Sequence, residues 1–144
     1  MLGANNLDHN ELLSIDTIDY QAEILRNDSS CKEKYSDKSF VSIFHDEQLW
    51  NFSEYWKFDL ALYALSKKEF MEDSPEMYKS VFRIYSYLLM SIGCCFDKND
   101  GFSITNLDDE TLYEMRERLK LVVEGLFQNK MPSNKIFKYQ NPYL

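Results

Sequence analysis

Apolar side chains recur every three or four positions over most of this chain, in runs that polar residues separate. Such spacing places the apolar side chains on one face of a helix. The pattern predicts four main helices, at Asp37–Trp50, Glu54–Phe70, Pro75–Phe96 and Leu107–Gln128. Short connections favour antiparallel neighbours. We therefore expect an all-α fold, a single-domain helical bundle over residues 1–144.

Capping residues mark where these helices begin. Ser53 is expected to cap the second helix, because a serine hydroxyl accepts a hydrogen bond from the free N–H groups of a first turn. The third helix has the clearest start signal, Ser74 followed by Pro75 at the first helical position. Its apolar positions cover almost the whole circumference, so we expect this helix in the middle of the bundle.

The two ends of the chain have weaker patterns. Residues 1–34 contain short apolar patches at Glu11–Ile15 and Tyr20–Leu25, which fit short N-terminal helical pieces or an arm laid on the bundle. The segment Met131–Leu144 contains two prolines and is expected to form an extended C-terminal tail. Its apolar side chains are available to pack back over the bundle: Ile136, Phe137, Tyr139 and Tyr143.

Composition supports a folded helical domain. Apolar residues make up 44% of the chain and aromatic residues 15%, enough for a substantial core. Glycine and proline are scarce, at four and three residues, which argues against a turn-rich β-sandwich.

Cysteine usage and hydropathy favour the cytoplasm. The three cysteines, Cys31, Cys94 and Cys95, are an odd number, and adjacent cysteines make a strained disulfide, so buried thiols in a reducing compartment are expected. The N-terminus is acidic, unlike a secretion signal. The uncharged run Ile84–Phe96 is shorter than the roughly 20 residues that span a bilayer.

Charge is unevenly distributed along the chain, whose net charge is −8. Residues 1–30 and residues 97–114 each carry six acids and one base, whereas residues 115–144 carry two acids and six bases. An acidic surface repels nucleic acid and anionic membranes and attracts basic partners. Solubility alone is the simpler explanation of the same charge.

Three patterns in the sequence resemble chemical sites, and none of them predicts a catalytic residue, a metal or a cofactor. The turn Asp97–Gly101 resembles a calcium loop, but such a loop needs glycine at position 6 and glutamate at position 12, and counted from Asp97 these positions hold Phe102 and Asp108. His45, Asp46 and Glu47 are consecutive, so they are expected to point around the helix without converging. Cys94 and Cys95 lie in an apolar run, which disfavours the reactive thiolate.

Asp59 is a carboxylate within the apolar pattern of its helix. We expect it to be buried and paired with Arg83 or a lysine as a structural ion pair. The chain also has ten tyrosines, most of them at core spacing. Tyrosine side chains that reach a surface are frequent binding hot spots. Those expected to do so are Tyr78, Tyr87 and Tyr113.

A resemblance to a known family extends from about Ile24 to Leu144 and leaves out the N-terminal arm, residues 1–23. It is carried by the stretches SSCKEKYSDKSFVSIFHD, VFRIYSYLLMSI, FDKNDGFSITNLDDETLYEMRERLKLVVEGLF and KMPSNKIFKYQNPYL. These resemble a family of bacterial immunity proteins, which neutralise the C-terminal toxin domains of contact-dependent growth-inhibition and related polymorphic toxin systems. The resemblance implies a cytoplasmic protein that performs no chemistry and whose partner is a cognate toxin domain.

Many such toxins are nucleases with basic grooves, so the acidic turn and the start of the last helix are the expected contact surface. Its candidate residues are Asp97, Asp100, Asp108, Asp109, Glu110, Tyr113 and Glu114. Two other functions remain open from the residues alone. One is an acidic adaptor or nucleic-acid mimic that binds another basic protein, and the other is a small enzyme whose site assembles only in three dimensions.

Overall fold

The computed structural model describes residues 17–18, 39–67 and 75–144. These residues form the helices α3 (Phe40–Glu47), α4 (Phe52–Ser66), α6 (Pro75–Cys95) and α7 (Asp109–Gln128), and a short 3-10 helix, η1 (Asn134–Ile136). The described part contains no strand. The prediction of an all-α bundle with four main helices is confirmed. The predicted N-terminal patches Glu11–Ile15 and Tyr20–Leu25 lie outside the described residues, as do His9 and Cys31.

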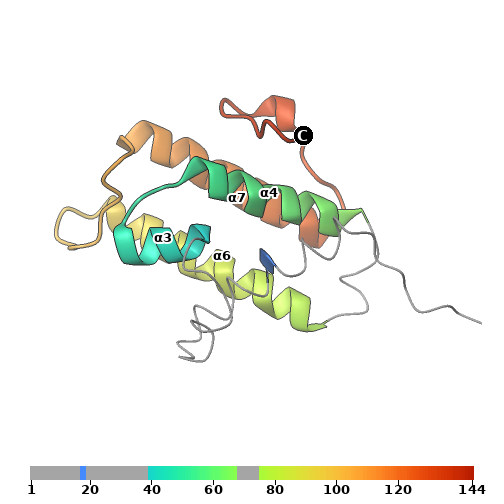
Figure 1. The fold of residues 1–144 in the computed structure, drawn as a ribbon, viewed down its shortest axis with the longest axis horizontal. Helices are drawn as coiled ribbons and strands as arrows, with labels where there is room; N and C mark the ends of the chain where they lie inside the picture. Colours follow the sequence, from blue (N-terminus) through green and yellow to red (C-terminus); the bar gives the residue numbers. More distant parts are fainter. Residues whose placement is uncertain (1–16, 19–38, 68–74) are drawn as a thin grey trace, which may run out of the picture.

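Helix α7 packs against both α4 and α6, and α3 packs against α4 (Figure 1). Trp50, before α4, contacts Asn106, before α7, and Tyr63 near the end of α4 reaches Pro132 beyond the end of α7. Helices α4 and α7 therefore run in the same direction. The expected antiparallel arrangement holds for the consecutive helices α6 and α7, and the parallel pair arises between helices that are not consecutive.

The first two helices begin and end at other residues than predicted. Helix α3 stops three residues before Trp50, because Gln48 adopts a left-handed conformation with φ 54°. The backbone N–H and C=O of Trp50 bond instead to the side chain of Asn106, each at 2.9 Å. Asn51, and not the predicted Ser53, caps α4 by accepting a hydrogen bond from the N–H of Glu54 at 3.0 Å.

The last two helices follow the prediction more closely. Helix α6 begins at Pro75 as expected and ends at Cys95, one residue before the predicted end. Ser74, the predicted cap of α6, lies outside the described residues, and so does Phe70, the predicted end of α4. Helix α7 ends at Gln128 as predicted, and it begins at Asp109 because Asp108 is its cap.

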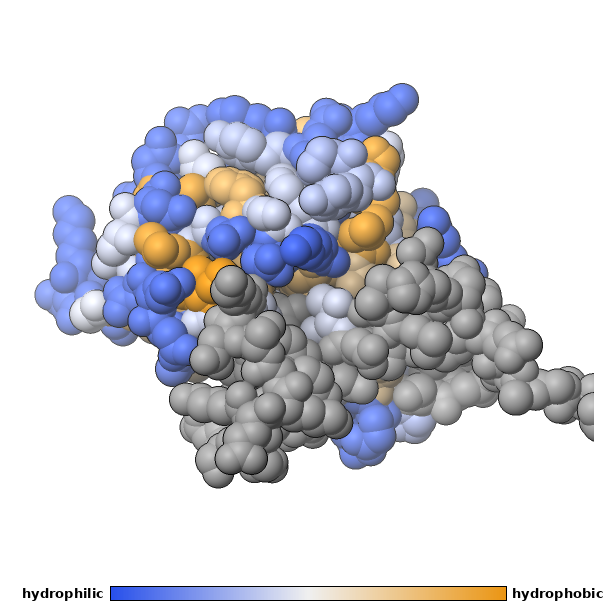
Figure 2. Space-filling view, in the orientation of Figure 1, coloured by the Kyte–Doolittle hydropathy of each residue, from blue (hydrophilic) through white to orange (hydrophobic). Residues whose placement is uncertain are grey.

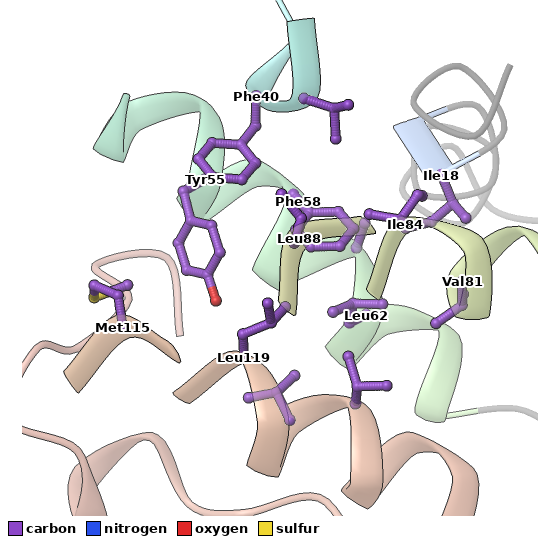
Figure 3. Close-up of a cluster of buried hydrophobic side chains, with 14 of the residues drawn as sticks. Ile18, Phe40, Tyr55, Phe58, Leu62, Val81, Ile84, Leu88, Met115 and Leu119 are labelled. Atoms are coloured by element: carbon purple, nitrogen blue, oxygen red, sulfur yellow. The ribbon is translucent and has the colours of Figure 1, made fainter. Parts of the chain in front are cut away.

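The core lies where the four helices meet (Figure 3). Phe40 of α3, Phe58 of α4, Leu88 of α6 and Leu119 of α7 are each no more than 1% exposed. Ile18, from the short described segment near the N-terminus, is fully buried in the same cluster. Apolar surface removed from water in this cluster is the main stabilising contribution, at about 25 cal/mol per Å².

The prediction that α6 lies in the middle of the bundle is wrong for one of its faces. Phe82 and Met90 are 61% and 66% exposed, while Val81, Ile84, Leu88 and Ile92 are fully buried. Only one face of α6 contacts the other described helices, and helical spacing alone cannot tell which apolar residues will find a partner. On the face shown in Figure 2, the described residues are mostly hydrophilic, with apolar side chains exposed between them.

The expectation of buried thiols is also corrected for Cys94 and Cys95. Both are free and only partly buried, because they lie in the last turn of α6 where it meets the loop to α7. A hydrogen bond to Asp100 raises the pKa of Cys94, and burial raises the pKa of Cys95. Both shifts favour the protonated thiol over the reactive thiolate.

The C-terminal tail returns along α7 immediately after the helix ends. Asn129 turns the chain in a left-handed conformation with φ 55°, and the N–H of Lys130 bonds to the carbonyl of Gly125 at 2.9 Å. The predicted extended tail is interrupted by η1. Of the side chains expected to pack back, Phe137 and Tyr139 do so, whereas Ile136 and Tyr143 are 64% and 54% exposed.

Gly125 lets the tail approach α7 closely, and replacing it tests this contact. A Cβ at this position would lie 2.8 Å from both the carbonyl oxygen of Lys130 and Cδ of Pro132. We expect Gly125→Ala to lower the free energy of unfolding by about 1–3 kcal/mol, as overpacking does. The matched control is Gly93→Ala in α6, where nothing lies within 4 Å. It should raise the free energy by about 0.5–1 kcal/mol, the gain for removing a helical glycine. Urea denaturation followed by circular dichroism measures both, and equal effects of the two variants would contradict the close approach.

Candidate functional site

The predicted acidic turn forms the loop between α6 and α7, which projects from one end of the bundle (Figure 1). Its first two carboxylates organise the turn itself. Asp97 accepts a hydrogen bond from the N–H of Asn99, and Asp100 accepts one from the N–H of Phe102, each at 2.9 Å. Both carboxylates are nevertheless exposed to solvent.

The loop is fixed to the junction between α3 and α4. The N–H of Thr105 bonds to the carbonyl of Gln48 at 3.0 Å, and the ring of Phe102 packs against Phe44 with centroids 5.4 Å apart. Together with the bonds of Asn106 to Trp50, these contacts hold the loop in one place. Its carboxylates are therefore presented from a fixed position.

The acids at the start of α7 divide into two groups. Asp108 is the helix cap, and Glu110 forms an ion pair with Lys138 of the tail at 3.3 Å. Asp109 and Glu114 make no hydrogen bond and no ion pair with the described part of the chain. The carboxylates of the second group thus make no direct polar contact within the described residues, and Asp109 also interacts favourably with the helix dipole.

The carboxylate of Asp108 caps α7, and the strength of this cap depends on pH. Its carboxylate accepts hydrogen bonds from the hydroxyl and the N–H of Thr111, which lower its pKa below the usual 3.8. A depressed pKa means that the folded state favours the ionised form. The cap therefore stabilises the fold fully above about pH 3.8, and this stabilisation is lost as the pH falls through the lower, folded-state pKa.

Replacing Asp108 with asparagine isolates this titration, because asparagine is an equally good cap that does not ionise. We expect the Asp108→Asn variant to be less stable than the wild type near neutral pH and to approach it as the pH falls below about 3.8. Thermal denaturation at a series of acidic pH values measures the difference. A difference that stays constant across the series would show that the carboxylate does not titrate with folding.

An exposed aromatic and cationic cluster lies beside these acids. The guanidinium of Arg116 is 5.1 Å from the ring centroids of both Phe96 and Tyr113. The two rings are 38% and 46% exposed, so the stack joins the end of α6 to the first half of α7 at the surface. Tyr113 was a predicted site residue, whereas Phe96 and Arg116 were not. The spacing of Tyr113 and Arg116, three apart on a helix, is the signal that would have found the second.

The structure brings the predicted site residues to one corner of the bundle. Phe96 directly precedes Asp97, and Tyr113 lies one helical turn after Asp109, so the stacking of Arg116 on both rings places the start of the loop beside the first half of α7. We call the corner residues Asp97, Asp100, Asp109, Tyr113, Glu114 and Arg116 the acidic corner. Of the other tyrosines expected to reach the surface, Tyr78 and Tyr87 are partly buried against the core.

A second polar cluster lies inside the molecule. Asp59 is buried, as predicted, but its partner is Arg118 and not Arg83 or a lysine. Nε and one terminal nitrogen of Arg118 donate to the two carboxylate oxygens of Asp59 at 2.9 and 2.7 Å, a bidentate geometry. Arg83 is exposed on α6.

Aromatic rings surround this buried pair. The guanidinium of Arg118 lies 4.6 Å from the ring centroid of Phe137, 5.0 Å from that of Trp56 and 6.0 Å from that of Tyr63. Burial works to lower the pKa of Arg118, but its hydrogen bonds and charge interaction with Asp59 outweigh this and raise the pKa. The side chains of Asp59 and Arg118 are 0% and 1% exposed, so no substrate reaches them and the pair is structural.

The histidine cluster differs in one detail from the prediction. Nδ1 of His45 lies 2.8 Å from a carboxylate oxygen of Asp46, so these neighbours do meet. They do so on the surface, at the end of α3, with both side chains more than half exposed. Within residues 17–18, 39–67 and 75–144, no three His, Cys, Asp or Glu side chains form a group that could hold a metal ion.

No described helix combines the length and the apolar composition needed to cross a membrane. The chain was also compared with known proteins. No protein-family model, no curated protein and no solved structure matches it.

Proposed function

We propose that this protein is an immunity protein, which binds a cognate bacterial toxin domain directly and neutralises it by covering a cationic surface of that domain. The proposal starts from the resemblance of residues 24–144 to such proteins. The observation that supports it best is the acidic corner, where fixed surface carboxylates adjoin an exposed Tyr113–Arg116 stack.

The charge of the corner fits a basic partner. Residues 97–114 carry six acids and one base, and Asp109 and Glu114 have no ion-pair partner in the described structure. Acidic surfaces accelerate the association of a cationic partner by long-range attraction. A toxin that acts on nucleic acid has a basic groove to hold phosphates, so a nuclease is the class of toxin that we propose.

The aromatic part of the acidic corner favours slow dissociation of a partner, which charge alone does not provide. Long-range attraction raises association rates, whereas slow dissociation depends on side chains that become fully desolvated in the complex. Tyrosine and arginine are enriched at such positions. Arg116 is already held between two rings, so less of its conformational freedom would be lost on binding.

Co-expression tests the proposal directly. The probe is the C-terminal domain of the protein encoded immediately upstream of this chain, produced under an inducible promoter. We expect that domain to arrest growth when expressed alone, and we expect co-expression of this protein to restore growth and to yield a stable complex of the two. Growth arrest that persists despite co-expression, or substrate turnover by the purified protein alone, would overturn the proposal.

A further inference from the structure

We propose that the segment Met131–Leu144, which we call the strap, is latched onto the buried Asp59–Arg118 pair and thereby sets the charge that the first turn of α7 presents. The latch lies inside the molecule and the charge lies on its surface. The strap connects them through Lys138 and Tyr139. Lys138 then competes with any cationic partner for the carboxylate of Glu110.

Asn141 forms the latch. It is 1% exposed, and its side-chain N–H₂ group donates to the carbonyl of Trp56 at 2.9 Å and to a carboxylate oxygen of Asp59 at 3.0 Å. Its side-chain oxygen accepts from the N–H of Tyr143 at 2.9 Å. Buried polar groups are costly unless they are paired, so the strap position that satisfies these atoms is strongly preferred.

Further contacts hold the strap against α4 and α7. The side chain of Asn134 donates to the carbonyl of Asn141 at 3.0 Å and accepts from its N–H at 2.9 Å, which closes the strap on itself. Arg118 donates to the carbonyl of Tyr139 at 3.3 Å, and the hydroxyl of Tyr63 donates to the carbonyl of Pro132 at 2.7 Å. The buried pair is therefore covered by the strap and bonded to it.

The outer side of the strap meets the start of α7. Nζ of Lys138 lies 3.3 Å from a carboxylate oxygen of Glu110, and the hydroxyl groups of Tyr139 and Thr111 are 3.3 Å apart. The hydrogen bond to Glu110, with the charge of that carboxylate, raises the pKa of Lys138. The carbonyl of Tyr139 accepts a hydrogen bond from Arg118, so the backbone next to Lys138 is held against the buried pair. This limits the positions that the ammonium group of Lys138 can reach.

A consequence for partner binding follows, and this part rests on the proposed function. While the strap is latched, Lys138 offsets the charge of Glu110. A cationic group of the toxin domain that pairs with Glu110 must displace Lys138, so toxin binding there and the Lys138 contact oppose each other. Such coupling is reciprocal: a change that frees Glu110 strengthens binding, and binding frees Lys138.

The test uses the full chain and three single variants. Asn141→Ala removes the latch itself. Asn134→Ala removes the hydrogen bonds that close the strap on itself and leaves the buried pair untouched. If Asn141→Ala does not fold, Asn134→Ala still tests the strap proposal. Ile136→Ala is the control, because Ile136 is a strap residue whose side chain is 64% exposed. Hydrogen exchange of the strap amides and the pKa of Lys138, followed by NMR, are the two readouts.

We expect Asn134→Ala to speed exchange of the strap amides by about tenfold, the effect of losing one to two hydrogen bonds, and to leave the amides of α4 and α7 protected. The pKa of Lys138 should fall toward the ordinary value of 10.5. Ile136→Ala should change neither. Unchanged strap exchange, or faster exchange with an unchanged pKa of Lys138, would overturn the strap proposal.

A fourth variant, Lys138→Gln, separates this proposal from the proposed function. With the upstream toxin domain as the probe, we expect its association rate constant to rise about two- to fivefold, the size of one exposed ion pair. If the NMR results are as expected and the toxin domain binds Lys138→Gln and the wild type equally, the strap stands and contact of the partner with Glu110 is overturned.

Discussion

Replacing Asp59 with alanine is expected to lower the free energy of unfolding by about 3–5 kcal/mol, the usual cost of removing one partner of a buried ion pair. The variant leaves the Arg118 guanidinium 1% exposed and without its carboxylate. It also removes the acceptor of one Asn141 hydrogen bond, so the strap loses part of its latch. For a domain of this size such a loss is a large share of the total stability, commonly 5–15 kcal/mol. Urea denaturation followed by tryptophan fluorescence and by circular dichroism measures the loss.

Two comparisons show whether the effect comes from the buried charge. The double variant Asp59→Leu, Arg118→Met should recover much of the stability, because replacing both charges by apolar side chains of similar volume leaves neither one unpaired. Lys79→Ala, which breaks the exposed pair of Lys79 with Glu76, should have no measurable effect. If Asp59→Ala were no more harmful than Lys79→Ala, solvent would have access to Arg118, contrary to the structure.

Reversing two charges of the acidic corner, Asp109→Lys with Glu114→Lys, is expected to slow association with the toxin domain by about 10- to 1000-fold at low ionic strength, the range over which electrostatic attraction changes association rates. These two residues are chosen because neither caps α7 nor bonds to the strap, so the fold should be kept. Stopped-flow fluorescence at several salt concentrations measures the rate constant. The difference from the wild type should shrink as salt screens the charges.

The matched control changes the net charge by the same amount elsewhere. Glu76→Lys with Glu124→Lys places the reversals at the start of α6 and near the end of α7, away from the acidic corner. We expect this variant to associate at a rate close to that of the wild type. If both double variants were slowed equally, net charge and not the corner would govern association, and our choice of surface would be wrong.

Much of the fold follows from local patterns in the sequence. Helix boundaries for α6 and α7 lie within two residues of the prediction, because proline, acidic residues and apolar spacing act within a single turn or face of a helix. The burial of Asp59 also follows from its place in an apolar stripe. The carboxylates and the tyrosine of the acidic corner could be selected for the same reason, because they lie close together in the sequence, whereas Arg116 was not selected; their role in binding a partner stays a prediction.

Only the tertiary structure decided which distant residues meet. Asp59 and Arg118 are 59 positions apart, and their pairing depends on the parallel packing of α4 and α7, which no spacing rule encodes. Asn141, 82 positions from Asp59, belongs to a tail whose sequence suggested only an extended segment. The exposed Phe82 and Met90 likewise have core-like spacing, but no helix of the described part of the chain covers them. Sequence periodicity fixes the faces of each helix, whereas the pairing of those faces is set by how the whole chain fills space and satisfies its buried charges.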